Sequence, residues 1–121
     1  MSFSLNEYLS DLKTLCAIDF NAAGTEAMAD FFESRYRALG LNTERRHYEN
    51  NDFAPFLLVE NGAPDQTIDF LMVAHMDTVF PVGEGAARPF AVDKNGIGHG
   101  PGCIDCKGGA LLIYYLVRDL L

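Results

Sequence analysis

The sequence has few basic residues and no long hydrophobic run, and both shortages exclude classes of function. Its 121 residues include 17 acidic and 9 basic side chains, which give a formal net charge of −8. Nucleic acids and anionic membranes bind basic surfaces, so neither is an expected partner. The longest apolar run, residues 110–117, is too short to span a bilayer. The N-terminus also lacks a basic leader followed by an apolar segment, so no signal peptide is predicted.

Cysteine is scarce and odd in number, since Cys16, Cys103 and Cys106 are the only three. A disulfide framework needs paired cysteines in a secreted chain, so we predict reduced thiols and a cytoplasmic location. Internal repeats, low-complexity tracts and linkers are lacking as well. A length of 121 residues is typical of one domain and sufficient for a hydrophobic core.

Three amphipathic or apolar helices are predicted. Residues 4–7 form a capping box, and the apolar spacing behind it extends a first helix to about Asp19. A second apolar pattern begins near Met28 and ends at Gly40, a left-handed cap. The last helix, residues 107–121, is apolar nearly all round, so we expect further chain to cover it.

The middle of the chain contains the predicted strands. Residues 42–48 and 55–61 suit strands, and residues 67–75 form the strongest one. A hairpin over residues 89–100 turns at residues 94–96. The continuous apolar run of 67–75 favours a strand covered by helices on both faces. We therefore predict an α/β fold, a three-layer sandwich in which a mixed, mostly parallel sheet is flanked by helices.

The predicted strand 67–75 ends in His75, and Asp77 follows two residues later. In an open α/β sheet, ligands bind beyond the carboxyl ends of the strands. A spacing of two on extended chain sends both side chains to the same face. Histidine is a common zinc ligand, and a neighbouring carboxylate can orient its ring. The alternative interpretation is a hydrogen-bonded histidine at a strand end, with Asp77 capping a turn.

A further carboxylate, Asp105, lies between the hairpin and the last helix, in the segment GPGCIDCKGG of residues 100–109. Taken alone, Asp105 could cap that helix. A phosphate-binding loop is excluded, because Asp105 takes the place of its third glycine and no Gly-Lys-Ser/Thr follows. An acid at this point repels phosphate and attracts a metal ion.

The thiols offer a rival metal or redox site. His99, Cys103 and Cys106 have a spacing that could hold zinc or act as a dithiol. They supply only three ligands, however, and a structural zinc site needs four. We therefore expect Cys106 to pack near the site without binding metal, and His47 to be a surface residue.

Together, HMDTVFP at residues 75–81 and GPGCIDCKGG at residues 100–109 resemble the co-catalytic di-zinc exopeptidases and deacylases. This family includes glutamate carboxypeptidase, acetylornithine deacetylase, succinyl-diaminopimelate desuccinylase and aminoacylase. Residues 72–109 are most similar to the glutamate carboxypeptidase branch. The two helices before them also fit the family, so the resemblance covers nearly the whole chain.

The resemblance implies a role for each matching residue. His75 would bind one zinc ion, Asp105 would bridge two, and the catalytic-site residue Asp77 would hold the His75 ring in its metal-binding tautomer. Two Zn²⁺ ions, or Co²⁺ in their place, would hold the water that attacks the substrate amide. The peptide bond between Asp105 and Cys106 would be cis. Cys106 replaces the aspartate or methionine usual at its position.

The same resemblance implies a metallo-carboxypeptidase or amidohydrolase that releases a glutamate-type C-terminal amino acid from a peptide or N-acyl substrate. The alternatives are a deacetylase or desuccinylase of the family, or a small non-catalytic module with the His99/Cys103/Cys106 site. The family's Glu-Glu pair, which supplies the general base, does not occur in this sequence. Residues 1–121 are therefore expected to be the N-terminal part of the catalytic domain, without its remainder and the inserted lid and dimerisation domain. Such a chain should be inactive alone, and the full-length enzyme should be a homodimer.

Overall fold

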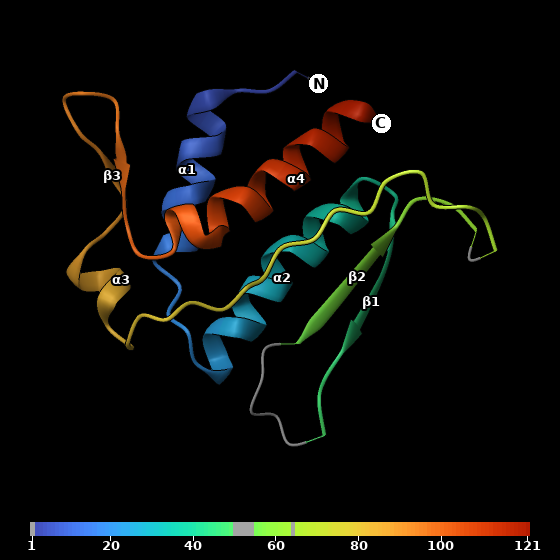
Figure 1. Ribbon diagram of the computed structural model, residues 1–121, viewed down its shortest axis with the longest axis horizontal. Coiled ribbons are helices and arrows are strands. Elements are labelled where there is room, and N and C mark those ends of the chain that lie inside the picture. The colour runs from blue at the N-terminus through green and yellow to red at the C-terminus, as the bar shows by residue number, and fades with distance from the viewer. Residues whose placement is uncertain (1, 50–54, 64) are drawn as a thin grey trace.

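The computed structural model describes residues 2–49, 55–63 and 65–121, which form helices and two small antiparallel sheets (Figure 1). The helices are α1 (Leu5–Cys16), α2 (Ala22–Ala38), the single turn α3 (Glu84–Ala87) and α4 (Gly108–Leu120). The strands are β1 (Asn42–Arg46), β2 (Phe56–Glu60), β3 (Ala91–Val92) and β4 (Gly98–His99). β1 pairs with β2 and β3 pairs with β4, in both cases antiparallel.

Helix α1 starts at the predicted cap but ends earlier than predicted. Ser4 Oγ accepts a hydrogen bond from the N–H of Glu7 at 3.4 Å. The Glu7 carboxylate does not complete the capping box, because it accepts hydrogen bonds from Arg118 of α4 instead. The helix ends at Cys16. Asp19 lies beyond it, and its carboxylate accepts a backbone N–H just before α3 at 3.0 Å.

Helix α2 begins and ends at residues that the sequence marks clearly. Asn21 Oδ1 accepts a hydrogen bond from the N–H of Gly24 at 2.7 Å, which satisfies a free donor of the first turn. At the other end Gly40 has a φ of 81°, and the buried Leu41 follows it. The predicted left-handed cap is therefore confirmed. From there the chain enters β1 directly.

The hydrophobic core lies where α1, α2 and α4 pack together. Its most completely buried side chains are Leu15, Cys16, Met28, Leu111 and Tyr115. Aromatic rings fill much of the remaining space, and Tyr36 of α2 meets Tyr114 of α4 edge to face at 5.4 Å between ring centroids. The opposite side of α4 is exposed, with Leu120 72% accessible to solvent. The predicted last helix is thus confirmed over residues 108–120, and one apolar side of it has no cover among the described residues.

The prediction of a strand over residues 67–75 is wrong. This segment runs without regular structure, drawn in yellow-green to yellow in Figure 1, and no described strand pairs with it. Phe70 and Val73 are 83% and 78% exposed. The apolar run predicts a preference for extended backbone, but a strand forms only when its N–H and C=O groups find a neighbouring strand. Within the described ranges, β1 and β2 pair only with each other, and 67–75 forms a ladder with neither.

The predicted three-layer sandwich depends on that strand and is affected by its absence. The described residues contain only short antiparallel sheets and no mostly parallel sheet, so the three-layer arrangement is not observed in them. The mixture of helices and small sheets is consistent with a partial α/β domain. The hairpin that turns at residues 94–96 is confirmed, whereas α3 forms in a segment for which no helix was predicted.

The structure also bears on the cysteines and on membrane spans. All three cysteines are free thiols. In the part of the chain that the structure describes, no helix has both the length and the apolar surface that crossing a membrane requires.

Buried ionisable groups should make the fold sensitive to alkali. Burial raises the pKa of the Cys16 thiol to about 11 and that of the Tyr36 hydroxyl to about 12. Between pH 9 and 12 the folded chain therefore holds protons that the unfolded chain has lost, so stability falls as pH rises. Burial also raises the pKa of Tyr8 and Tyr115, whereas it lowers the pKa of Lys107, which opposes the fall.

We expect the urea concentration at the midpoint of unfolding to decrease between pH 9 and 12, with the first part of the decrease missing in Cys16→Ala. The midpoint is measured by circular dichroism at each pH. A midpoint that is unchanged from pH 8 to 12 would show that these groups are not buried in the folded chain.

Candidate metal centre

His75 and Asp105 come from separate segments and meet at one point. His75 lies at the end of the unpaired segment 67–75, and Asp105 lies in the turn Cys103–Lys107 that leads into α4. The distance from His75 Nε2 to Asp105 Oδ1 is 2.9 Å. Both side chains are accessible, with exposed fractions of 48% and 82%. The structure therefore places a nitrogen and a carboxylate oxygen, two atoms that bind metals, side by side on an open surface.

Asp77 faces the other ring nitrogen of His75. His75 Nδ1 lies 3.1 Å from Asp77 Oδ1 and 3.0 Å from the backbone oxygen of Asp77. A carbonyl oxygen can only accept, so Nδ1 must carry the proton that makes this hydrogen bond. In a neutral ring Nε2 then has a free lone pair directed at Asp105. This tautomer is the one that a metal ligand at Nε2 needs.

Without a metal, a proton on His75 Nε2 would be stabilised by the neighbouring carboxylate of Asp105. The hydrogen bond to Asp105 raises the pKa of His75 above its usual value, partial burial opposes this shift, and Asp77 adds to it. Acceptors therefore face both ring nitrogens, which favours the doubly protonated ring. A metal ion bound here would replace the proton on Nε2 and relieve the same negative charge.

The sulfur of Cys106 lies close to this pair. Ligand atoms of His75, Asp105 and Cys106 are all within 4.8 Å of one another, and no other such group of three occurs among the described residues. The sulfur accepts a hydrogen bond from the His75 N–H and donates one to the His75 oxygen, both at 3.3 Å. Because the His75 backbone engages the sulfur, Cys106 lies beside the site, and the imidazole nitrogen and carboxylate oxygen are the donors that would suit Zn²⁺ or Co²⁺.

The rival thiol site does not form in the described residues. His99 Nε2 lies 2.8 Å from Asp93 Oδ2 within the hairpin, and His99 is not part of the cluster around His75. Cys103 is not part of it either. His47 is half exposed and paired with Glu26 at 2.5 Å, as expected of a surface residue.

The turn that carries Asp105 has a distinct backbone. Gly102 has a φ of 74°, and a Cβ there would lie 2.7 Å from Thr78 Cγ2. Asp105 itself is not helical, with φ −128° and ψ 89°. The peptide bond between Asp105 and Cys106 is cis, as the resemblance implies.

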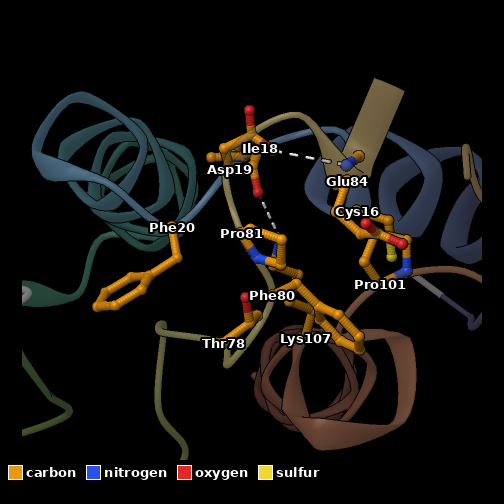
Figure 2. Close-up of a pocket in the computed structure, with 11 residues that line it drawn as sticks. Cys16, Ile18, Asp19, Phe20, Thr78, Phe80, Pro81, Glu84, Pro101 and Lys107 are labelled. Carbon is orange, nitrogen blue, oxygen red and sulfur yellow. Dashed lines mark hydrogen bonds between the residues drawn. The ribbon is translucent and has the colours of Figure 1, made fainter. Parts of the chain in front are cut away.

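Sequence reasoning missed Lys107, which it treated only as the first residue of the last helix. Its side chain is buried beside Cys16, Thr78 and Pro101 (Figure 2). The cavity left among these residues has a volume of only about 10 Å³, which is close to the space needed for one water molecule. The one signal in the sequence is a lysine between a cysteine and a glycine at the start of an apolar helix.

The comparison with protein families agrees with the position of this cluster. Residues 71–121 match the family model described as Peptidase family M20/M25/M40. The matched part includes His75, Asp77 and Asp105. This similarity covers less than half of the chain, and it does not single out glutamate carboxypeptidase. A search of curated proteins found no match.

Proposed function

We propose that this chain contributes His75 and Asp105 to the zinc centre of a metallopeptidase or amidohydrolase of the M20 type. The observation that carries the proposal is the 2.9 Å contact between His75 Nε2 and Asp105 Oδ1, with Asp77 behind the ring. The proposal includes the domain assignment: residues 1–121 are the N-terminal part of the catalytic domain. The remaining ligands and the general base would come from residues that this sequence does not contain.

Each side chain has a separate task in this proposal. His75 offers Nε2, and Asp105 offers two carboxylate oxygens, which suit a bridging position between two ions. Asp77 keeps the proton of His75 on Nδ1. Bound zinc would lower the pKa of a water molecule and polarise the amide carbonyl of the substrate. The 82% exposure of Asp105 leaves this side of the centre open to a substrate.

The proposed reaction is hydrolysis that releases a glutamate-type C-terminal amino acid from a peptide or N-acyl substrate. The preference for glutamate is supported by the similarity of residues 72–109 to the glutamate carboxypeptidase branch. Deacetylation or desuccinylation of an N-acyl amino acid uses the same amide chemistry and is the alternative within the family.

The test is a calorimetric titration of the chain with Zn²⁺. We expect His75→Ala and Asp105→Asn to remove most of the binding, because each deletes a ligand. Asp77→Asn should weaken binding about 10–100-fold, the usual effect of losing a group that orders a ligand.

The matched control is His99→Ala, which removes another exposed histidine paired with an aspartate and also disrupts the rival thiol site. It should leave the affinity for Zn²⁺ unchanged. Loss of binding in His99→Ala together with intact binding in His75→Ala would overturn the proposal.

A further inference from the structure

Lys107 is a buried cation two residues beyond Asp105. Its side chain is only 2% exposed, and its ammonium group donates hydrogen bonds to Leu15 O at 2.8 Å and Ile18 O at 2.6 Å. Leu15 O lies in the last turn of α1 and also accepts the N–H of Ile18 at 3.1 Å, whereas Ile18 lies two residues beyond the helix. A cation is favoured there by the carbonyl oxygens at the helix end and by the helix dipole. Lys107 thus joins the start of α4 to the end of α1.

The backbone of Lys107 closes the turn that carries Asp105. Its N–H donates to Gly102 O at 2.9 Å, so both ends of the turn are fixed in position. Asp105, between them, is exposed and contacts His75 through Oδ1. Because so little packs around Asp105, its position depends on how firmly the turn is held. The buried side chain of Lys107 links that turn to the end of α1 by hydrogen bonds, while Cys103 of the same turn packs against the core.

The same end of α1 also supports the segment that follows His75 and Asp77. Asp19 accepts hydrogen bonds from the N–H groups of Gly83 and Gly85, at 3.0 and 3.5 Å. Figure 2 shows Asp19 and Lys107 on the same pocket, which Thr78 and Pro81 also line. Residues 15–19 therefore contact both the turn that carries Asp105 and the segment at residues 83–85, beyond Asp77.

We propose that Lys107 is a positioning residue, which holds Asp105 against His75 by anchoring the turn Cys103–Lys107 to the end of α1. Lys107 does not contact the metal itself. Its effect on metal affinity rests on the function proposed above, whereas its effect on the contact between His75 and Asp105 does not require a metal.

The experiment compares Lys107→Met with Arg118→Met. Methionine keeps most of the apolar side chain of lysine and removes its donors. Arg118 is the matched control, because it is a buried cation, 6% exposed, that ties the other end of α4 to Glu7 and to Ser2 O. Both substitutions should lower stability, so the proportion of folded chain is first measured by circular dichroism.

Two readouts on the folded chain separate positioning from general stability. Without metal, nuclear Overhauser contacts between the His75 ring and the β-protons of Asp105 should be lost in Lys107→Met and retained in Arg118→Met. With Zn²⁺, affinity should fall about 10–100-fold in Lys107→Met and stay unchanged in Arg118→Met. If Lys107→Met does not fold, Lys107→Gln takes its place, since glutamine keeps a donor on a shorter side chain, and the same ranking is expected.

The outcomes distinguish this inference from the proposed function. Intact contacts between His75 and Asp105 in the folded Lys107 variant would overturn the positioning role, whatever the metal affinity. Equal losses in the Lys107 and Arg118 variants would also overturn it. Zn²⁺ binding that survives unchanged in His75→Ala would instead contradict the proposed function, while the metal-free contacts still test Lys107.

Discussion

The 121-residue chain is expected to release no glutamate from N-acyl-glutamate substrates, even with excess Zn²⁺. Hydrolysis at a zinc centre needs three protein ligands, an open coordination position and a general base. The chain supplies His75 and Asp105 as ligands, and Asp77 is engaged with the His75 ring. The sequence has no Glu-Glu pair to act as the base. Release of glutamate, measured by amino-acid analysis, should therefore equal the rate without protein.

A longer protein that also supplies the missing ligands and base should be active in the same assay. We expect His75→Ala in that protein to lower kcat/KM by at least about 100-fold, because a deleted ligand costs no less than a deleted supporting group. His99→Ala provides the control and should retain full activity. Turnover by the 121-residue chain that disappears in His75→Ala would mean that the chain holds a complete site, contrary to the proposal.

The chain is also expected to self-associate through the exposed side of α4. Leu112, Leu116 and Leu120 are spaced four residues apart on that side and are 51%, 51% and 72% exposed. Soluble monomers rarely leave an apolar stripe of this kind uncovered. Sedimentation velocity should therefore show a weight-average mass that rises with protein concentration.

Charged substitutions on the stripe should reverse this association. Burial of one leucine contributes about 1.5–3 kcal/mol, so the double substitution Leu112→Lys and Leu116→Lys should weaken association roughly a hundredfold. Lysine forms helices nearly as well as leucine, so α4 should persist. Leu5→Lys, an exposed leucine of α1, should have no effect. A chain that remains monomeric at all concentrations would contradict the expectation.

Local sequence signals predicted the helices and turns well. Gly40 and the hairpin turn at residues 94–96 act through their own backbone preferences, and the structure confirms both. The segment 67–75 was predicted wrongly because a strand requires a partner, and an apolar run contains no information about where that partner lies. Helix α3 was missed for a similar reason, since the carboxylate of the distant Asp19 accepts a hydrogen bond from the N–H of Gly83, the residue that precedes the helix.

In the candidate site, too, some features could be predicted from the sequence and others depend on contacts between distant residues. The association of His75, Asp77 and Asp105 was predicted from the resemblance of residues 75–81 and 100–109 to a known family, because residue types and spacing alone also allow a strand-end histidine and a helix cap. Lys107 acts on backbone carbonyls of Leu15 and Ile18. Every residue has a carbonyl, so nothing in the sequence marks these two as its partners. Only the packing of α4 against α1 reveals the contact.

Anomalous X-ray diffraction from crystals of the chain grown with Zn²⁺ tests most directly whether His75 and Asp105 bind metal. Data collected on both sides of the zinc absorption edge locate the ion without reference to activity. We predict a zinc peak about 2.0–2.1 Å from His75 Nε2 and about 2.0–2.2 Å from an oxygen of Asp105. Zinc bound by His99 and Cys103, with His75 and Asp105 still joined by a direct hydrogen bond, would contradict the proposal.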